Sequence, residues 1–261
     1  MTEPANESDG ARSARPESVG IVGGTGPAGS ALAARLADVG YSVVVGSRSK
    51  YRSMEVVDHI LETWPDRRLD IVPGDNALAA AADSVVIATP WDAAAITARS
   101  VSEHLHGKVV TTMSNALARV DDEFVPLIPP RGSVAASVQA TVPTARVAAT
   151  LQHIPATELG NLDEPLHGDV LICSDWRDAT AAVAEMVGRI PGARTLDCGN
   201  LSNATAIEAF TAVLMQLNVR YRTRVALRLV GLDHVMGVVQ PSSGAANADD
   251  DPAGAASAAA V

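Results

Sequence analysis

Cysteines and aromatic residues are scarce in this sequence. Its two cysteines, Cys173 and Cys198, stand alone, without the spacing of a zinc site or a redox motif. We therefore expect two buried, reduced thiols and no metal site. Aromatic residues make up only 3% of the chain, and much of its 47% hydrophobic content is alanine and valine. Small side chains of this kind suit helices packed closely on a parallel sheet.

Long apolar runs and an excess of positive charge are also missing. No stretch of about 20 apolar residues could span a bilayer, and no charged and then apolar segment indicates secretion. These features predict a soluble, cytoplasmic protein with no membrane partner. With 30 acidic and 20 basic residues, the formal net charge is −10, which argues against a nucleic-acid partner.

Both ends of the chain lack apolar periodicity. Residues 1–16 are rich in small and polar side chains, and the chain beyond about Gln240 runs through a polar segment into small residues. Such compositions cannot bury enough apolar surface to fold. We expect 1–16 to be a disordered tail and 233–261 to be mostly disordered.

Strands and helices alternate along residues 17–140. Apolar runs predict strands at 18–22, 42–45, 69–72, 84–89 and 109–112, with helical patterns between them. Repeated βα units predict an α/β fold, a Rossmann-type doubly wound parallel sheet with helices on both faces. Ligands of such sheets bind beyond the carboxyl ends of the strands. The residues that follow four of these strands should therefore line one crevice, at 24–28, 46–48, 89–91 and 113–115.

The pattern changes after Pro130. Strands are predicted at 146–152, 169–173 and 194–197, a helix from 175 or 176 to about 189, and a long last helix from 201 onward with Ser202 as its N-cap. We assign residues 141–232 to a smaller C-terminal α/β domain. The last helix carries an apolar seam that suits either the core or a dimer interface, formed by Ile207, Phe210, Leu214, Leu217 and Tyr221.

Three glycines follow the first strand at the spacing G-x-G-x-x-G. In a turn from strand to helix, Gly24 makes the turn, Gly26 lets the backbone approach a pyrophosphate, and Gly29 permits close helix packing. The free N–H groups of the helix then face the phosphates. An ordinary glycine-rich turn has the same residues, but the strand before, the helix after and the second strand favour a dinucleotide site.

The end of the second strand indicates which dinucleotide binds. NAD sites carry Asp or Glu there to bind the ribose hydroxyls. This chain has Ser47 and Arg48, with Arg52 close behind, and a guanidinium binds a 2′-phosphate through charge-assisted hydrogen bonds. The sequence favours NADP over NAD, although a solvated basic turn would look the same.

An ordered set of motifs carries a family resemblance. They are Gly-Gly-Thr-Gly at 23–26, Val-Val-Gly-Ser-Arg at 44–48, Pro90-Trp91, His153-Ile154-Pro155-Ala156, Asn161-Leu162-Asp163 and Leu201-Ser202-Asn203. Together, over about residues 18–232, they resemble the coenzyme F-420-dependent NADP oxidoreductases. The resemblance implies reversible hydride transfer between carbon 5 of the deazaflavin coenzyme F-420 and carbon 4 of NADP(H). It also implies a small C-terminal domain that covers the deazaflavin and, commonly, a homodimer.

The resemblance assigns binding residues for each part of the two cofactors. It implies that the pyrophosphate contacts Thr25, Gly26, Pro27 and Ala28, and the 2′-phosphate Ser47, Arg48 and Arg52. The nicotinamide half would lie along Trp91, Asn115 and Ala156, and the deazaflavin along Gln152, Ile154 and Leu227, largely through backbone groups. The family pattern Leu-His-Thr-Ile-Pro is altered here to Leu-Gln-His-Ile-Pro at 151–155. A shift by one residue turns a strand side chain to the opposite face, which argues against a direct contact from His153.

Hydride transfer between two bound rings requires orientation and exclusion of water rather than a side-chain acid or nucleophile. We therefore expect no catalytic side chain, and we favour a structural role for His153, Glu158 and Asp163 over a catalytic triad.

Two alternative functions stay open. One is another NADPH-dependent reductase on the same scaffold, with an imine or ketone substrate, and the other is a non-catalytic NADP(H)-sensing protein.

Overall fold

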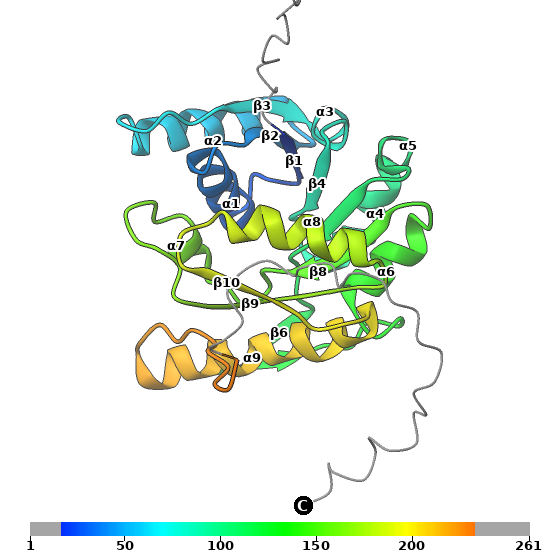
Figure 1. Ribbon diagram of the computed structural model, residues 1–261, viewed down its shortest axis with the longest axis vertical. Coiled ribbons are helices and arrows are strands. Elements are labelled where there is room, and N and C mark those ends of the chain that lie inside the picture. The colour runs from blue at the N-terminus through cyan, green and yellow to red at the C-terminus, as the bar shows by residue number, and fades with distance from the viewer. Residues whose placement is uncertain (1–16, 233–261) are drawn as a thin grey trace, which may run out of the picture.

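One mixed sheet organises the computed structural model, which describes residues 17–232. The expected tails, 1–16 and 233–261, lie outside the described residues. The sheet contains β1 (Ser18–Val22), β2 (Ser42–Ser47), β3 (Ile71–Asp75), β4 (Ser84–Ile87), β5 (Val109–Thr112), β8 (Arg146–Thr150), β9 (Gly168–Ser174) and β10 (Ala193–Asp197). Its eight strands are ordered β10-β9-β8-β5-β4-β1-β2-β3 (Figure 1).

Six neighbouring strands have the Rossmann order. From β3 through β2, β1, β4 and β5 to β8, every neighbouring pair is parallel. β2 and β3 are added on one side of β1, whereas β4, β5 and β8 are added on its other side, so the strand order switches between β1 and β4. A crevice opens at such a switch point, beyond the carboxyl ends of the strands. The predicted α/β, Rossmann-type parallel sheet is confirmed.

The last two strands extend the same sheet. β9 runs antiparallel to β8, and β10 pairs with β9 in parallel, so the start of β9 lies at the edge where β8 ends. The sheet therefore runs across the predicted domain boundary at residue 140. Both predicted parts, 17–140 and 141–232, contribute strands to this one sheet. Their division into an NADP-binding domain and a deazaflavin-covering domain stays a prediction.

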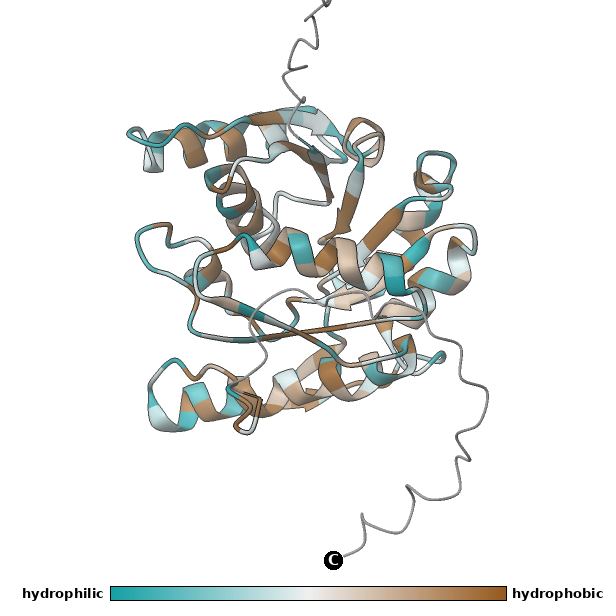
Figure 2. Ribbon diagram, viewed as in Figure 1, coloured by the Kyte–Doolittle hydropathy of each residue, from teal (hydrophilic) through white to brown (hydrophobic). Residues whose placement is uncertain are grey.

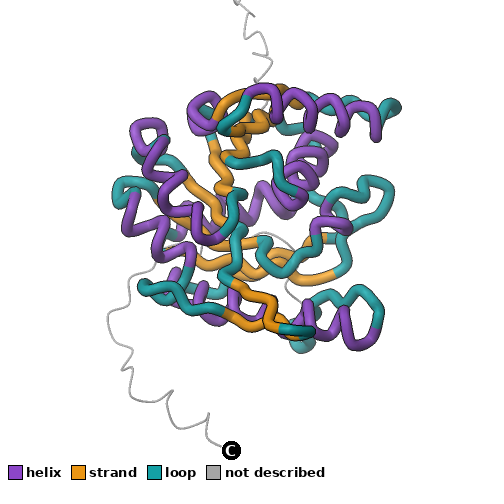
Figure 3. Tube along the Cα trace, turned by 180° about the vertical axis from the view of Figure 1, so that it is seen from behind, coloured by secondary structure: helices purple, strands orange, loops and turns teal. Residues whose placement is uncertain are grey.

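Helices cover both faces of the sheet and close two apolar cores (Figures 1 and 3). One core lies under α1 (Pro27–Asp38), α2 (Lys50–Thr63), α7 (Ala156–Leu159) and α8 (Arg177–Gly188). The other lies under α3 (Asn76–Ala80), α4 (Trp91–Ser100), α5 (Ser102–Leu105), α6 (Val134–Thr141), the 3-10 turn Leu201–Asn203 and the start of α9 (Ala204–Tyr221). Figure 2 shows apolar strands between helices of mixed hydropathy, as expected for a sheet buried on both faces.

Three local predictions need correction. β3 does not stop at Pro73 but continues through it to Asp75, which is possible because β3 is an edge strand and a proline there removes no ladder bond from the interior. Ser202 is not the N-cap of the last helix, because it lies inside the 3-10 turn and α9 begins one residue after Asn203. The hairpin of β6 (Leu117–Val120) and β7 (Glu123–Pro126), which packs on α9, was not predicted.

Within residues 17–232, no helix has both the length and the apolar character needed to cross a membrane.

Candidate active site

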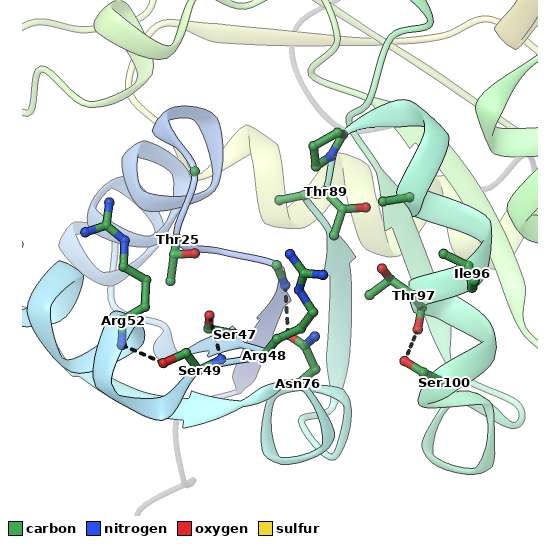
Figure 4. Close-up of a pocket in the computed structure, with 15 residues that line it drawn as sticks. Thr25, Ser47, Arg48, Ser49, Arg52, Asn76, Thr89, Ile96, Thr97 and Ser100 are labelled. Carbon is green, nitrogen blue, oxygen red and sulfur yellow. Dashed lines mark hydrogen bonds between the residues drawn. The ribbon is translucent and has the colours of Figure 1, made fainter.

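A cleft of about 920 Å³ opens at the carboxyl ends of the central strands. Its walls come from the connections that follow β1, β2, β3 and β4, at the switch point of the sheet. The lining residues are Gly23, Thr25, Gly26, Ser47, Arg48, Ser49, Arg52, Asn76, Ala88, Thr89, Pro90, Ala93, Ile96, Thr97 and Ser100 (Figure 4). Five predicted binding residues thus share one cavity: Thr25, Gly26, Ser47, Arg48 and Arg52.

The glycine loop is fixed by hydrogen bonds to neighbouring connections. The Gly23 N–H donates to Oδ1 of Asn76 (3.1 Å), and the Gly24 N–H donates to the carbonyl of Gly46 (2.9 Å). The loop after β1 is therefore anchored to the end of β2 and to the start of α3. Asn76 was not predicted as a cleft residue, because it reaches the cleft only from its place at the start of α3.

The three motif glycines have different surroundings. A Cβ on Gly26 would meet no protein atom within 4 Å, so this backbone faces open space. A Cβ on Gly29 would lie 2.7 Å from Cα of Gly24, which explains why α1 can pack so closely on the loop. Gly26 is also the N-cap of α1, and no side chain caps that end. The first N–H groups of α1 are therefore available to an anion such as a diphosphate.

Basic and hydroxyl groups form the β2 side of the cleft. Ser47 is buried and its Oγ accepts a hydrogen bond from the Ser49 N–H (3.2 Å), while Ser49 caps α2. Arg48 and Arg52 are exposed, and Arg52 pairs with Glu55 on the solvent side (3.1 Å). Among the described lining residues there is no carboxylate. This wall is suited to a further phosphate group.

The opposite wall is one face of α4. Ile96, Thr97 and Ser100 line the cleft there, and in Figure 4 they lie across the hollow from Ser47 and Ser49. We did not predict these residues. In the sequence, only their spacing indicates that they share a face of the helix: Thr97 follows Ile96 by one position and Ser100 follows it by four.

Other predicted residues lie outside this lining. Pro27 and Ala28 form the first turn of α1, Trp91 is the first residue of α4, and Ala156 is the first residue of α7. Asn115 follows β5; its side-chain amide donates to the carbonyl of Gln152 (2.8 Å) and its Oδ1 accepts from Thr211 (3.3 Å). Asn115 thus joins the Rossmann strands to the segment after β8.

The predicted deazaflavin residues gather near the end of β8 and the start of β9. The Gln152 side chain donates to the carbonyl of Thr112 (3.3 Å), and Nε2 of His153 lies 2.7 Å from the carbonyl of Asp169. The Asp169 N–H in turn donates to the carbonyl of Leu227 (2.8 Å). Gln152 and Leu227 therefore lie at the same edge of the sheet, linked through His153 and Asp169.

Comparisons with known proteins agree with this geometry. A family model described as "NADP oxidoreductase coenzyme F420-dependent" matches residues 18–116. The chain is 33% identical to the "F420-dependent NADP reductase" of Methanocaldococcus jannaschii over 221 residues, which cover 82% of this chain and 99% of that protein. It is 34% identical to the protein of the same name from Methanothermobacter marburgensis, with 82% and 98% covered.

The chain belongs to the coenzyme F-420-dependent NADP oxidoreductase family. A crystal structure of a putative F420-dependent NADP reductase from Arthrobacter sp. FB24 has the same fold, with a TM-score of 0.68 and 23% identity over 82% of this chain and 98% of that one.

No triad forms in this family member from His153, Glu158 and Asp163. His153 is 5% exposed and bonds to a main-chain carbonyl, whereas Asp163 pairs with Arg67 (2.9 Å). Burial lowers the pKa of His153, so the ring is neutral at pH 7. Both cysteines are free, but only Cys173 is buried as expected, whereas Cys198 is half-buried. Burial raises the pKa of the Cys173 thiol to about 12, as for an inert thiol. Within residues 17–232, no three His, Cys, Asp or Glu side chains gather as metal ligands.

Proposed function

We propose that this chain is an NADPH:coenzyme F-420 oxidoreductase, which transfers a hydride reversibly between NADP(H) and the deazaflavin. One observation supports this most directly. The cleft combines an open glycine loop with a basic wall that lacks a carboxylate, in a chain that aligns with nearly the whole length of a reductase named for both cofactors.

The NADP half has specific assignments. The backbone of Thr25, Gly26, Pro27 and Ala28 holds the pyrophosphate, supported by the open space at Gly26 and the uncapped start of α1. Ser47, Arg48 and Arg52 hold the 2′-phosphate, supported by their place on one wall of the cleft.

The reacting rings lie between the Rossmann strands and the segment after β8. Trp91, Asn115 and Ala156 flank the nicotinamide, and Gln152, Ile154 and Leu227 contact the deazaflavin. The bond from Asn115 to the Gln152 carbonyl supports this arrangement, because it ties the two groups together. The two cofactors supply the hydride chemistry, and the protein orients them and excludes water. Residues 141–232 act as the part that covers the deazaflavin.

A titration tests the proposal. Purified protein is mixed with the oxidised deazaflavin and NADPH, and the visible absorbance of the deazaflavin is followed. Catalytic bleaching that depends on both compounds supports the oxidoreductase. NADPH oxidation only with an added imine or ketone supports the other reductase. NADPH binding with no turnover of any of them supports a sensing protein.

We also propose that the protein is a cytoplasmic homodimer. The dimer is supported by α9, where Ile207 and Leu214 of the apolar seam are buried but Phe210 and Tyr221 are exposed. Light scattering on the purified protein measures the mass, and Phe210→Glu should shift a dimer toward the monomer. The cytoplasmic location rests on the sequence features described above, and cell fractionation tests it.

A further inference from the structure

Arg35 is a buried arginine on α1 whose side chain binds a distant loop. It is 1% exposed, and its guanidinium donates to four main-chain carbonyls. The acceptors are Leu159 (2.9 Å from Nε), Glu158 (2.8 Å from Nη2), Glu164 (3.1 Å from Nη1) and Asn161, also through Nη2. All four lie within residues 158–164, more than 120 positions along the chain.

The loop at 158–164 and Arg35 stabilise each other, because the loop offers carbonyl acceptors and Arg35 offers N–H donors. Helix α7 has only four residues, and the last carbonyls of any helix lack partners within it. A buried guanidinium is stabilised only when its donors are used. Arg35 donates to the last two carbonyls of α7, those of Glu158 and Leu159, and the loop carbonyls solvate its charge.

This contact joins the two halves of the proposed active site. α1 begins at Pro27, directly after Gly26 in the loop assigned to the pyrophosphate, and reaches Arg35 roughly 12 Å further along its axis. α7 begins at Ala156, immediately after Ile154 and Pro155. The two helices also pack on each other, and at the C-cap of α7 a Cβ added to Gly160 would lie 3.2 Å from Cβ of Ala31.

We infer that Arg35 is a positioning residue for hydride transfer: by binding the carbonyls at 158–164, it fixes the segment 154–156 relative to the helix that holds NADP. The inference rests on the proposed function. Arg35 touches neither cofactor and acts through the loop. A displacement of about 1 Å between reacting groups can slow a reaction about 100-fold while binding persists.

The test uses Arg35→Gln and Arg35→Lys in the full chain. In Arg35→Gln, amides at 156–164 should exchange hydrogen at least tenfold faster without cofactors, whereas those of α1 keep their protection. The Kd for NADPH should stay within about threefold, kcat should fall 10- to 100-fold, and the deuterium isotope effect on kcat should rise. Lysine keeps the charge but not the planar set of five N–H donors. Arg35→Lys should therefore have an amide exchange rate and a kcat between those of the wild type and Arg35→Gln.

Arg67→Gln is the matched control. Arg67 also binds this loop, through the Leu162 carbonyl (3.2 Å) and Asp163 (2.9 Å), but both of these residues lie beyond the end of α7, whereas Arg35 also binds the carbonyls of Glu158 and Leu159 within that helix. The kcat of Arg67→Gln should stay within threefold of that of the wild type. An equal loss in Arg67→Gln, or a lower Tm in Arg35→Gln with unchanged kcat and isotope effect, would overturn the inference.

A second variant covers the case in which Arg35→Gln does not fold. Gly160→Ala places a Cβ 3.2 Å from Cβ of Ala31, so α1 and the end of α7 must separate by a few tenths of an ångström with no change in charge. This variant should lower kcat several-fold at unchanged NADPH affinity. Unchanged kcat in this variant and in Arg35→Lys would also overturn the inference. If the wild-type enzyme does not react with the deazaflavin, the proposed function fails, whereas the exchange measurement still shows whether Arg35 holds the loop.

Discussion

We propose that charge at the end of β2 decides which dinucleotide the cleft accepts, because the ribose of the adenosine half carries a 2′-hydroxyl in NAD and a 2′-phosphate in NADP. Arg48 is exposed on the cleft wall, and its guanidinium can reach a ligand without breaking a contact of the fold. Arg52 also lines the cleft but shares its charge with Glu55. Of the two, Arg48 should therefore contribute more to the choice of cofactor.

We expect Arg48→Glu to weaken NADPH binding by about 2 to 4 kcal/mol, with a much smaller effect on NADH, because a charge-assisted contact is replaced by repulsion. Calorimetric titration of both dinucleotides measures this. Arg177→Glu is the control: it makes the same charge change on α8, at the end of the sheet opposite the cleft. Equal affinity of the wild type for NADH and NADPH would contradict the assignment of the β2 wall.

Gly26 tests the phosphate loop. Its φ is −80°, and a side chain there would project into the cleft rather than into protein atoms. Gly26→Val should therefore fold normally, with an unchanged circular dichroism spectrum, and lose measurable dinucleotide binding. Gly107→Val is the comparison at a glycine with equally open space far from the loop, although its φ of +69° adds strain. Retained NADPH affinity in Gly26→Val would remove the loop from the site.

His153 should matter for structure and not for proton transfer. Its ring is neutral and bonds to the Asp169 carbonyl, which stands next to the Leu227 contact. His153→Ala should slow turnover less than about tenfold, because a general acid or base typically contributes 10²- to 10⁴-fold. Steady-state kinetics decides this, and a loss of 100-fold or more at unchanged Tm would identify His153 as a chemical participant.

At the scale of elements, the apolar runs predicted the Rossmann strands because a sheet buried on both faces selects continuous Val, Ile and Ala. They missed the β6–β7 hairpin because Leu117–Val120 and Glu123–Pro126 are short and largely exposed, so burial imposed no pattern on them. The sequence also could not predict that β9 runs antiparallel to β8. Strand direction depends on the path of the long connection between the two strands, which the apolar pattern of each strand does not record. Arg48 could be found by motif spacing, but Asn76 and Ile96 could not, because each reaches the cleft only through the packing of α3 and α4.

The junction of α9 and α6 contains a buried carboxylate. Glu208 is 4% exposed and accepts the N–H groups of Val134 (2.8 Å) and Ala135 (3.1 Å) at the start of α6. Burial outweighs these two bonds and raises the pKa of Glu208 to about 7. Since the pKa is higher in the folded than in the unfolded chain, the folded state binds the proton more tightly between these values. The contribution of Glu208 to stability is present below about pH 4.5 and is lost as pH rises to about 7.

Glu208→Gln should remove that dependence. We expect the free energy of unfolding of the wild type, relative to the variant, to fall by up to about 3 kcal/mol between pH 4.5 and 7.5. Urea titrations at a series of pH values measure the difference. Glu62→Gln, at an exposed position on α2, is the control and should leave the pH profile of the wild type unchanged. Parallel profiles for wild type and Glu208→Gln would show that the carboxylate ionises normally.

On the scale of the whole molecule, the site that we propose for the reacting rings combines two groups of residues that contain no strong acid or base. Trp91 and Asn115 belong to the Rossmann connections, and the segment from Ile154 to Ala156 follows β8. Asn115 donates to the carbonyl of Gln152, two residues before this segment, and so ties the first group to the chain that leads into the second. Side chains of this kind suit two flat rings about 3 to 3.5 Å apart, the separation of a near-attack conformer, but they are poorly suited to moving protons.

Direct hydride transfer follows from this arrangement. When NADPH deuterated on carbon 4 reduces the deazaflavin, the label should appear on carbon 5 of the deazaflavin, because no group in the assigned site exchanges it with water. Mass spectrometry and proton NMR of the product locate the deuterium, and parallel runs with each of the two C4 positions labelled show which face of the nicotinamide reacts. A mirror experiment with unlabelled NADPH in D₂O should leave carbon 5 without deuterium. Incorporation from solvent in the mirror experiment, or loss of label in the first, would require a proton-transfer step and a residue to perform it, and neither Trp91 nor Asn115 could serve.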